Sequence, residues 1–303
     1  MEFNKKLYIF SSMQKQITSS SVPFSGEITE ADRARFEEKG YLAFEQILSD
    51  SEVAEATAAL TELVHTNAFV EGRSIYIPPV GNGRAKFKSP SSPFFIEMEP
   101  GYEPSPERMD ELELKVRKFM LFANEHAVFQ RMIQGHPRIG KVIDALLGPG
   151  AKMFQSMALV KPPFIGIEKP WHQDNAYFSM TPLDAIVGVW IALDSATVRN
   201  GCMHVIEGGH KKGPLKHHHT FDCEIEEGRL RTEDAVPVEL APGGAMFFYG
   251  MLPHQTPPNN SPDRRRALQF HYHSAQARAN EREIYDTIFA EADGTPASCA
   301  AAR

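Results

Sequence analysis

The sequence is poor in cysteine, with only Cys202, Cys223 and Cys299 among its 303 residues. Three scattered cysteines cannot build a disulfide framework or a four-cysteine zinc site. We therefore expect free thiols, which suits a reducing compartment and predicts a cytoplasmic location. Long apolar runs are also missing: no stretch approaches the ~20 residues that a membrane-spanning helix needs, which excludes a membrane protein.

Positive charge is in short supply as well. The chain has 32 Lys and Arg residues against 39 Asp and Glu, which leaves a net charge of −7. Because phosphate binding requires a basic face, this balance argues against nucleic acid as a partner. A hydrophobic content of 42% and a charged content of 23% are typical of a soluble globular protein. We expect a small-molecule partner and a monomer or homodimer.

The first half of the chain reads as mainly helical. Residues 1–26, rich in Ser, Gln and Lys, predict a mobile arm that precedes a single domain over 27–278. Good N-cap residues predict helices after Thr29, after Ser49 (a capping box with Glu52) and after Ser105, and a fourth helix spans 139–147. The third helix would bury a stripe running from Met109 to Ala123. A short strand is expected over 40–44, and long loops with one strand at most over 72–104.

From about residue 150 the pattern changes to short runs of β-branched and aromatic residues between Gly, Pro and Asn turns. Such spacing is typical of a sandwich or barrel. We therefore predict an α+β fold with a mainly β core, in which N-terminal helices pack around a C-terminal barrel. Residues 279–303 would form a C-terminal helix and tail. The expected strands are 154–160, 186–193, 203–206, 245–249 and 267–272.

A His-x-Asp pair, His172 and Asp174, is the first candidate for chemistry. In a strand, residues two apart point to the same face, so both side chains could reach one metal while Gln173 turns away. Together with a second histidine they would form the two-histidine, one-carboxylate set that holds Fe(II) and leaves coordination positions open. On its own, the pair could equally be a surface histidine beside a solvated aspartate.

A later segment supplies the missing parts. His254 follows an apolar run, Thr256 lies two residues further on, and Arg265 stands eleven residues after His254, beyond a Pro- and Asn-rich reversal. We expect a hairpin that returns Arg265 beside the strand carrying His254, with Ala267, Gln269 and His271 on the face of Arg265. A guanidinium there would pair with the distal carboxylate of a 2-oxo acid chelated to the iron, and Thr256 could add a hydroxyl donor.

These residues resemble the phytanoyl-CoA dioxygenase family of Fe(II)/2-oxoglutarate-dependent oxygenases over roughly residues 30–275. The segment Asn200 to His210 resembles the family's Asn-Gly-x-Leu-x-x-x-Pro-Gly-Ser-His segment, with Glu207 and Gly209 in place of Pro and Ser. Before the distal histidine, Gly243-Gly244 replaces the common Gly-Asp. The resemblance implies a double-stranded β-helix (a jelly-roll or cupin-like barrel) with helices on one sheet, iron, 2-oxoglutarate and O2 as cofactors, and hydroxylation of a small organic molecule with release of succinate and CO2. Because Asp174 is present, halogenation is not expected.

Several further residues are weaker candidates. Gln155 resembles a position that can hydrogen-bond the co-substrate, although it could be an ordinary polar residue on a half-buried strand. Tyr177 and Phe178 could line the substrate pocket, and Trp190 could wall it or simply pack in the core. His217-His218-His219 invites a second metal site, but three consecutive residues cannot all face one ion, which favours a solvated loop. A basic group, Arg84, Lys86 and Lys88, could bind an anionic substrate or could simply belong to the solvated surface.

Two other functions remain open from the sequence. A non-catalytic relative would bind metal or ligand without turnover, and an O2-independent, cupin-like metalloenzyme would use the metal as a Lewis acid. The chain does not identify the substrate, because specificity would lie in loops such as 72–104 and 211–235.

Overall fold

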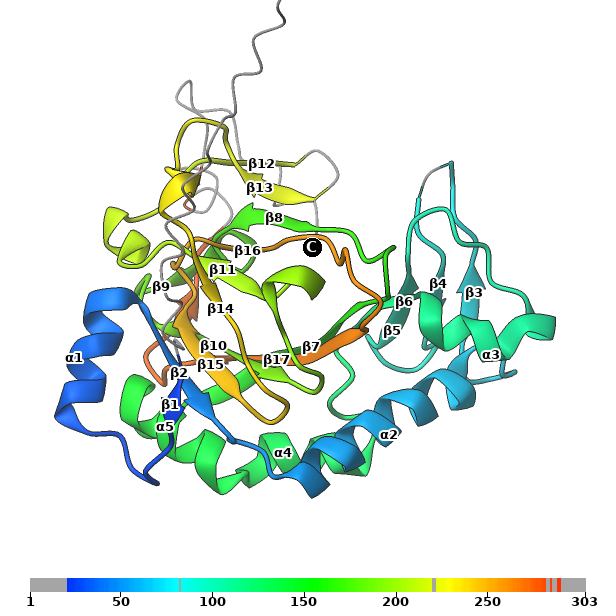
Figure 1. Cartoon of the computed structure of the whole chain (residues 1–303), viewed down its shortest axis with the longest axis horizontal. Helices are drawn as coiled ribbons and strands as arrows, with labels where there is room; N and C mark the ends of the chain where they lie inside the picture. The colour runs from blue at the N-terminus through cyan, green and yellow to red at the C-terminus, as the bar shows by residue number, and fades with distance from the viewer. Residues whose placement is uncertain (1–20, 82, 220–221, 282–283, 285–287, 290–303) are drawn as a thin grey trace, which may run out of the picture.

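Two β-sheets face each other in the computed structural model, which describes residues 21–81, 83–219, 222–281, 284 and 288–289 (Figure 1). The larger sheet has the strand order β1 (Val22–Pro23), β2 (Tyr41–Glu45), β15 (Ala245–Tyr249), β10 (Ile186–Ala192), β17 (Arg265–His273), β7 (Lys152–Lys161), β6 (Val116–Met120), β5 (Phe95–Met98), β4 (Lys86–Lys88) and β3 (Ile75–Ile77). The smaller sheet has the order β14 (Val236–Val238), β11 (Met203–Val205), β16 (His254–Thr256) and β8 (Lys169–His172). Two short ribbons pair β12 (His217–His219) with β13 (Cys223–Ile225), and β18 (Arg278–Ala279) with β9 (Met180–Thr181).

The longer helices cover the outer face of the larger sheet (Figure 1). They are α1 (Glu30–Lys39), α2 (Asp50–Asn67), α4 (Ala127–Gly135) and α5 (Pro137–Leu147), whereas α3 (Met109–Leu112) and α6 (Asn175–Phe178) are single turns. Thr29 and Ser49 form the capping boxes of α1 and α2, with Asp32 and Glu52 as the reciprocal partners. Side chains alternate along β15: Phe247 packs on the helices and Phe248 on the barrel interior.

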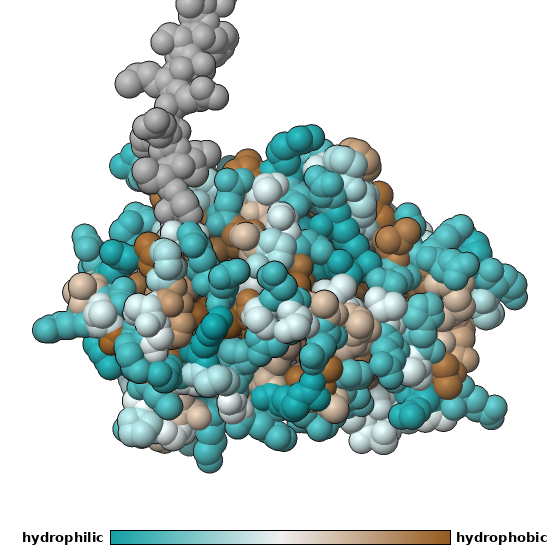
Figure 2. Space-filling model, turned by 60° about the horizontal axis from the view of Figure 1, so that its bottom comes forward, coloured by the Kyte–Doolittle hydropathy of each residue, from teal (hydrophilic) through white to brown (hydrophobic). Residues whose placement is uncertain are grey.

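The expected α+β fold with a mainly β core and helices on one sheet is therefore confirmed. On the face of the molecule shown in Figure 2, hydrophilic residues predominate and the hydrophobic ones are scattered among them. In the described part of the chain, no helix is long and apolar enough to cross a membrane.

Several expectations for the first half were wrong. Ser105 opens only a 3-10 turn and α3, and the segment from Val116 to Met120 is a strand because it pairs with both β5 and β7. The region 72–104 holds three strands rather than one at most, since β3, β4 and β5 extend the larger sheet. Tertiary pairing has overridden a helical pattern here.

The ends also differ in part. The expected arm, 1–26, is too long by several residues, because Val22–Pro23 pairs with β2, and residues 1–20 lie outside the described residues. The expected C-terminal helix and tail, 279–303, falls mostly outside them too. Cys202 is a free, buried thiol, whereas Cys223 is half of a disulfide, so the expectation that all three thiols stay free was wrong.

Candidate functional site

Three buried side chains converge inside the barrel. His172 ends β8 and His254 begins β16, and the two residues are direct partners across these antiparallel strands. Asp174 lies just past the strand, with helical backbone at the start of α6. One ligand atom from each residue lies within 4.8 Å of the others, and the residues are 4%, 3% and 2% exposed for His172, Asp174 and His254. The expected strand geometry was wrong, because a turn and not a continued strand brings Asp174 to the histidines. The grouping itself could hold a metal ion.

Backbone carbonyls fix the orientation of both imidazoles. Nδ1 of His172 donates to the carbonyl of Pro170 at 2.8 Å, and Nδ1 of His254 donates to the carbonyl of Leu252 at 2.9 Å. These bonds leave both Nε2 atoms directed at Asp174, whose Oδ1 lies 3.4 Å from His172 and 3.8 Å from His254. Burial, followed by the neighbouring His172, lowers the pKa of His254 to about 3, so its ring is neutral. A neutral ring with a free Nε2 lone pair is the form that binds a metal.

The second oxygen of Asp174 is held from the opposite sheet. Oδ2 accepts from Nε2 of His271 at 2.7 Å and from Nε2 of Gln269 at 3.4 Å. Burial alone would raise the pKa of Asp174, but His271 and His254 lower it well below its ordinary value. His271 and Gln269 were not assigned this role from the sequence, although the alternation along the strand of Arg265 placed them on the right face.

Gln173, between His172 and Asp174, turns away from them as expected. Its side-chain amide donates to the carbonyls of Met251 and Gly213, and its backbone N–H donates to Nε2 of His217 at 3.0 Å. His217 is completely buried in β12, so the solvated-loop interpretation fails for this residue. His218 lies 3.1 Å from Glu224. Within the described residues, His172, Asp174 and His254 form the only group that could hold a metal ion.

A cavity of about 890 Å³ opens in front of the three residues. It is lined by these three residues and by Gln155, Thr256, Arg265, Tyr177 and Phe178. Trp190 does not line it; it is fully buried behind Arg265, whose guanidinium lies 5.4 Å from the indole ring centre. Trp190 therefore packs in the core, which was one of the two roles that the sequence left open for it, and does not wall the pocket.

Arg265 opens a strand as expected, but this strand does not pair with the one that carries His254. It does not form a hairpin with His254: β16 belongs to the smaller sheet, and Arg265 on β17 pairs with Lys161 on β7 in the larger sheet. The chain crosses from one sheet to the other between Thr256 and Arg265. Arg265 is 1% exposed, and its guanidinium donates from Nη1 to the carbonyl of Leu159 at 3.1 Å, while its Nε has no hydrogen-bond partner. Burial lowers the pKa of Arg265 to about 10, so it remains a buried cation.

A buried cation without a carboxylate partner needs an anion. Gln155, whose Oε1 has no hydrogen-bond partner, lines the cavity opposite His271, whereas Arg265 and the hydroxyl-bearing Thr256 line another part of it. Lys161 lies beside them and donates to the carbonyls of Thr256 and Ile167. Burial, followed by Arg265 itself, holds the pKa of Lys161 well below its ordinary value. The residues fit a dicarboxylic 2-oxo acid beside a metal ion.

Comparison with solved structures identifies the class of fold. EvdO2 from Micromonospora carbonacea var. aurantiaca in complex with 2-oxoglutarate superposes with a TM-score of 0.60 at 24% identity, covering 89% of this chain and all of that one. EctD from S. alaskensis with bound Fe superposes with a TM-score of 0.61 at 20% identity, covering 88% and 84%. The fold is thus the jelly roll of iron- and 2-oxoglutarate-dependent oxygenases, as expected.

The family follows from the sequence. The model of the phytanoyl-CoA dioxygenase (PhyH) family matches residues 36–267, and the chain belongs to this family. It is 29% identical over 261 residues to phytanoyl-CoA dioxygenase 1 of Oryza sativa subsp. japonica, covering 82% of this chain and 90% of that protein. It is 25% identical over 260 residues to phytanoyl-CoA dioxygenase domain-containing protein 1 of Danio rerio, covering 80% and 89%. Iron and 2-oxoglutarate are accordingly its cofactors, and it is a dioxygenase.

Proposed function

We propose that the protein hydroxylates an unactivated C–H bond of a small organic molecule, with His172, Asp174 and His254 as the iron ligands. Arg265 and Thr256 would hold the distal carboxylate of 2-oxoglutarate, and Gln155 would donate a further hydrogen bond to the co-substrate. Bound Fe(II) and 2-oxoglutarate together supply the oxidising chemistry, in which O2 is consumed and succinate and CO2 are released.

The observation that carries this proposal is that a possible metal site and a buried cation without a carboxylate partner face the same cavity. The histidine and aspartate ligand atoms lie within 4.8 Å of one another, and the buried Arg265 faces the same space with no carboxylate on it. Tyr177 and Phe178 also line the cavity, and Phe178 packs edge-on against His271 with ring centres 4.8 Å apart. These two rings would exclude water from the reacting end and orient the substrate over the open metal positions.

The test is spectroscopic before it is catalytic. Under anaerobic conditions, Fe(II) and 2-oxoglutarate should give a visible charge-transfer band with the wild-type protein and none with Asp174→Ala. A wild-type protein without the band, which also forms no succinate with any substrate mixture, would end the proposal. Normal iron binding without 2-oxoglutarate binding would favour a non-catalytic relative instead, and activity under strict anaerobiosis would favour a Lewis-acid enzyme.

A further inference from the structure

The cavity continues well beyond the metal-binding residues along the inner face of the larger sheet. Strand register places two rows of side chains there. One row runs from Gln269 through Met157 and Met120 to Phe95, each a direct cross-strand partner of the next. It is apolar after Gln269, which itself contacts Asp174. A substrate lying along this row from the metal would contact sulfur and aromatic carbon.

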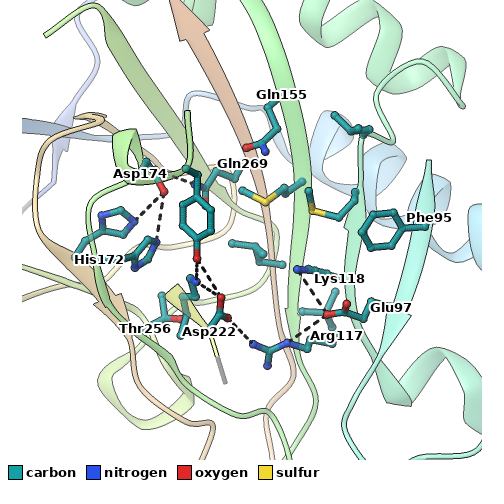
Figure 3. Close-up of a pocket in the computed structure, with 18 of the residues that line it drawn as sticks. Phe95, Glu97, Arg117, Lys118, Gln155, His172, Asp174, Asp222, Thr256 and Gln269 are labelled. Atoms are coloured by element: carbon teal, nitrogen blue, oxygen red, sulfur yellow. Dashed lines mark hydrogen bonds and ion pairs between the residues drawn. The ribbon is translucent and has the colours of Figure 1, made fainter. Parts of the chain in front are cut away.

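The second row is charged. Lys118 pairs across the strands with Glu97, and Glu97 pairs with Lys86, and all three side chains line the cavity. Arg84 and Arg117 line the same end. Figure 3 shows Lys118, Arg117 and Glu97 together at the side of the cavity away from His172 and Asp174. Of the predicted basic trio, Arg84 and Lys86 thus belong to the cavity wall, whereas Lys88 is exposed.

The cations at this end outnumber the carboxylates. Four of them share Glu97, at 3.3 Å for Arg84 and Lys86, 3.6 Å for Lys118 and 3.8 Å for Arg117. Glu97 is 2% exposed. Burial would raise its pKa, but the cations, Lys118 foremost, lower it below its ordinary value, so Glu97 is ionised and its single charge is divided among four partners.

Arg117 lies near three carboxylates but makes no close ion pair with any of them. Its side chain is only 10% exposed, yet its carboxylate contacts are at 3.8 Å to Glu97, 3.8 Å to Asp222 and 4.0 Å to Glu99, and its Nη2 donates a 3.5 Å bond to the carbonyl of Glu168. Charge-assisted hydrogen bonds to carboxylates are about 2.7–2.9 Å long, so none of these contacts is one.

The other carboxylates near Arg117 are committed or weakened. Asp222 lies 2.6 Å from Nζ of Lys169 and accepts from the Tyr177 hydroxyl at 3.0 Å. Burial raises the pKa of Glu99 to about 7 in spite of Arg117, so it is only partly ionised at neutral pH. The buried guanidinium of Arg117 thus shares distant carboxylates with other cations and makes no close ion pair, which is a costly arrangement for a buried charge.

We propose that the substrate carries an anionic group, a carboxylate or a phosphate, that binds Arg117 at the far end of this cavity. The apolar part of the substrate lies along Met157, Met120 and Phe95, with the oxidised carbon at the metal end. This inference rests on the proposed function and adds the substrate's chemical class. A cavity of about 890 Å³ has room for the co-substrate and one small molecule of this kind.

Binding to the anaerobic Fe(II)·2-oxoglutarate complex tests the idea, measured by calorimetry and by the change in the charge-transfer band. The probes are hexanoate, hexyl phosphate and the neutral hexanamide. At least one of the two acids should bind at least about tenfold more tightly than the amide, the loss expected when a charge-assisted hydrogen bond is missing. Comparing the two acids tells a carboxylate site from a phosphate site.

Three variants separate charge recognition from structural damage. Arg117→Gln should weaken binding of the preferred acid about tenfold and leave 2-oxoglutarate affinity within about twofold of wild type. Glu97→Gln should tighten acid binding, because it removes the competing carboxylate, whereas structural damage would weaken it. Arg108→Gln, which alters an exposed arginine 3.8 Å from Glu111, should change neither affinity.

Hexanamide binding as tightly as both acids, no saturable binding of either acid at millimolar concentration, or unchanged acid binding in Arg117→Gln would overturn the inference. Each of these results is obtained on a complex that already binds iron and 2-oxoglutarate. They therefore leave the proposed function standing, which fails only if that complex does not form.

Discussion

Three consecutive arginines, Arg264, Arg265 and Arg266, provide a sharp test of the co-substrate site because each has a different environment. Arg264 lies 2.6 Å from Glu113, and Arg266 makes two bonds of 2.7 and 2.8 Å to Asp194. Arg265 alone faces the cavity, with its guanidinium over Trp190. We predict that Arg265→Lys selectively weakens 2-oxoglutarate binding.

The magnitude follows from what lysine cannot replace. An ammonium supplies one point charge where the guanidinium supplies a fork, so one charge-assisted hydrogen bond of about 1.5–3 kcal/mol is lost. The contact with Trp190 contributes roughly another 0.5–1 kcal/mol. Together these losses of roughly 2–4 kcal/mol correspond to a 2-oxoglutarate Kd raised about 30- to 1,000-fold. Iron binding should stay near the wild-type level, since Arg265 contacts none of the three proposed iron ligands.

The assay is an anaerobic titration of the Fe(II) protein with 2-oxoglutarate, followed by its charge-transfer band. Arg266→Lys is the matched control: it loses a fork to Asp194 outside the cavity and should leave the 2-oxoglutarate Kd within about twofold. Equal affinities for Arg265→Lys and wild type, or an equal loss in the Arg266 control, would refute the assignment of Arg265 to the co-substrate.

Three further changes test other parts of the structure. Gly188→Ala places a Cβ 2.5 Å from the ring of Phe248, which packs on His254 with ring centres 4.9 Å apart. We therefore expect the free energy of unfolding, measured by thermal unfolding, to fall by about 1–3 kcal/mol and Fe(II) to bind more weakly. Unchanged values would contradict the close packing. The pKa of Glu99 is raised from 4.5 to about 7, so folding is favoured while the group is neutral and this contribution is lost as pH rises through 7. Urea unfolding should therefore show Glu99→Gln more stable than wild type by roughly 2–3 kcal/mol at about pH 8.5 and little different at pH 4.5; the same gain at both values would rule out ionisation as the cause. Thr29→Ala removes the cap of α1, which accepts from the backbone N–H of Asp32 at 3.1 Å, and should cost about 1 kcal/mol in urea unfolding without altering 2-oxoglutarate affinity.

Local signals in the sequence predicted most of the barrel and the grouping of His172, Asp174 and His254. Capping residues mark helix starts directly, and strands of alternating apolar residues have a recognisable period. The position of Arg265 was harder, because proximity in sequence to His254 suggested a hairpin, whereas the chain changes sheets between them. Which strand a segment pairs with depends on contacts distant in sequence.

The charged end of the cavity could not be predicted from the sequence, for a related reason. Val116 and Phe119 fit a helical stripe continuing from Met109, and only the pairing of this segment with β5 and β7 shows that it is a strand. Once the segment is a strand, Lys118 faces Glu97 across the sheet. A sequence pattern cannot show that four cations from separate strands and loops will share one buried carboxylate.

The division of the site between two sheets has a mechanical consequence. His172 and His254 belong to the smaller sheet, whereas Arg265, Gln155 and the partners of Asp174 belong to the larger one. A metal ion and a dicarboxylate bound together would add a link between the two sheets, which are joined here by the contacts of Asp174 and by the hydrogen bond from Lys161 to Thr256. Because a ligand that binds only the closed barrel stabilises it by mass action, the loaded protein should exchange its β8 and β16 amide hydrogens more slowly than the empty one. Release of succinate would then remove this link between the sheets.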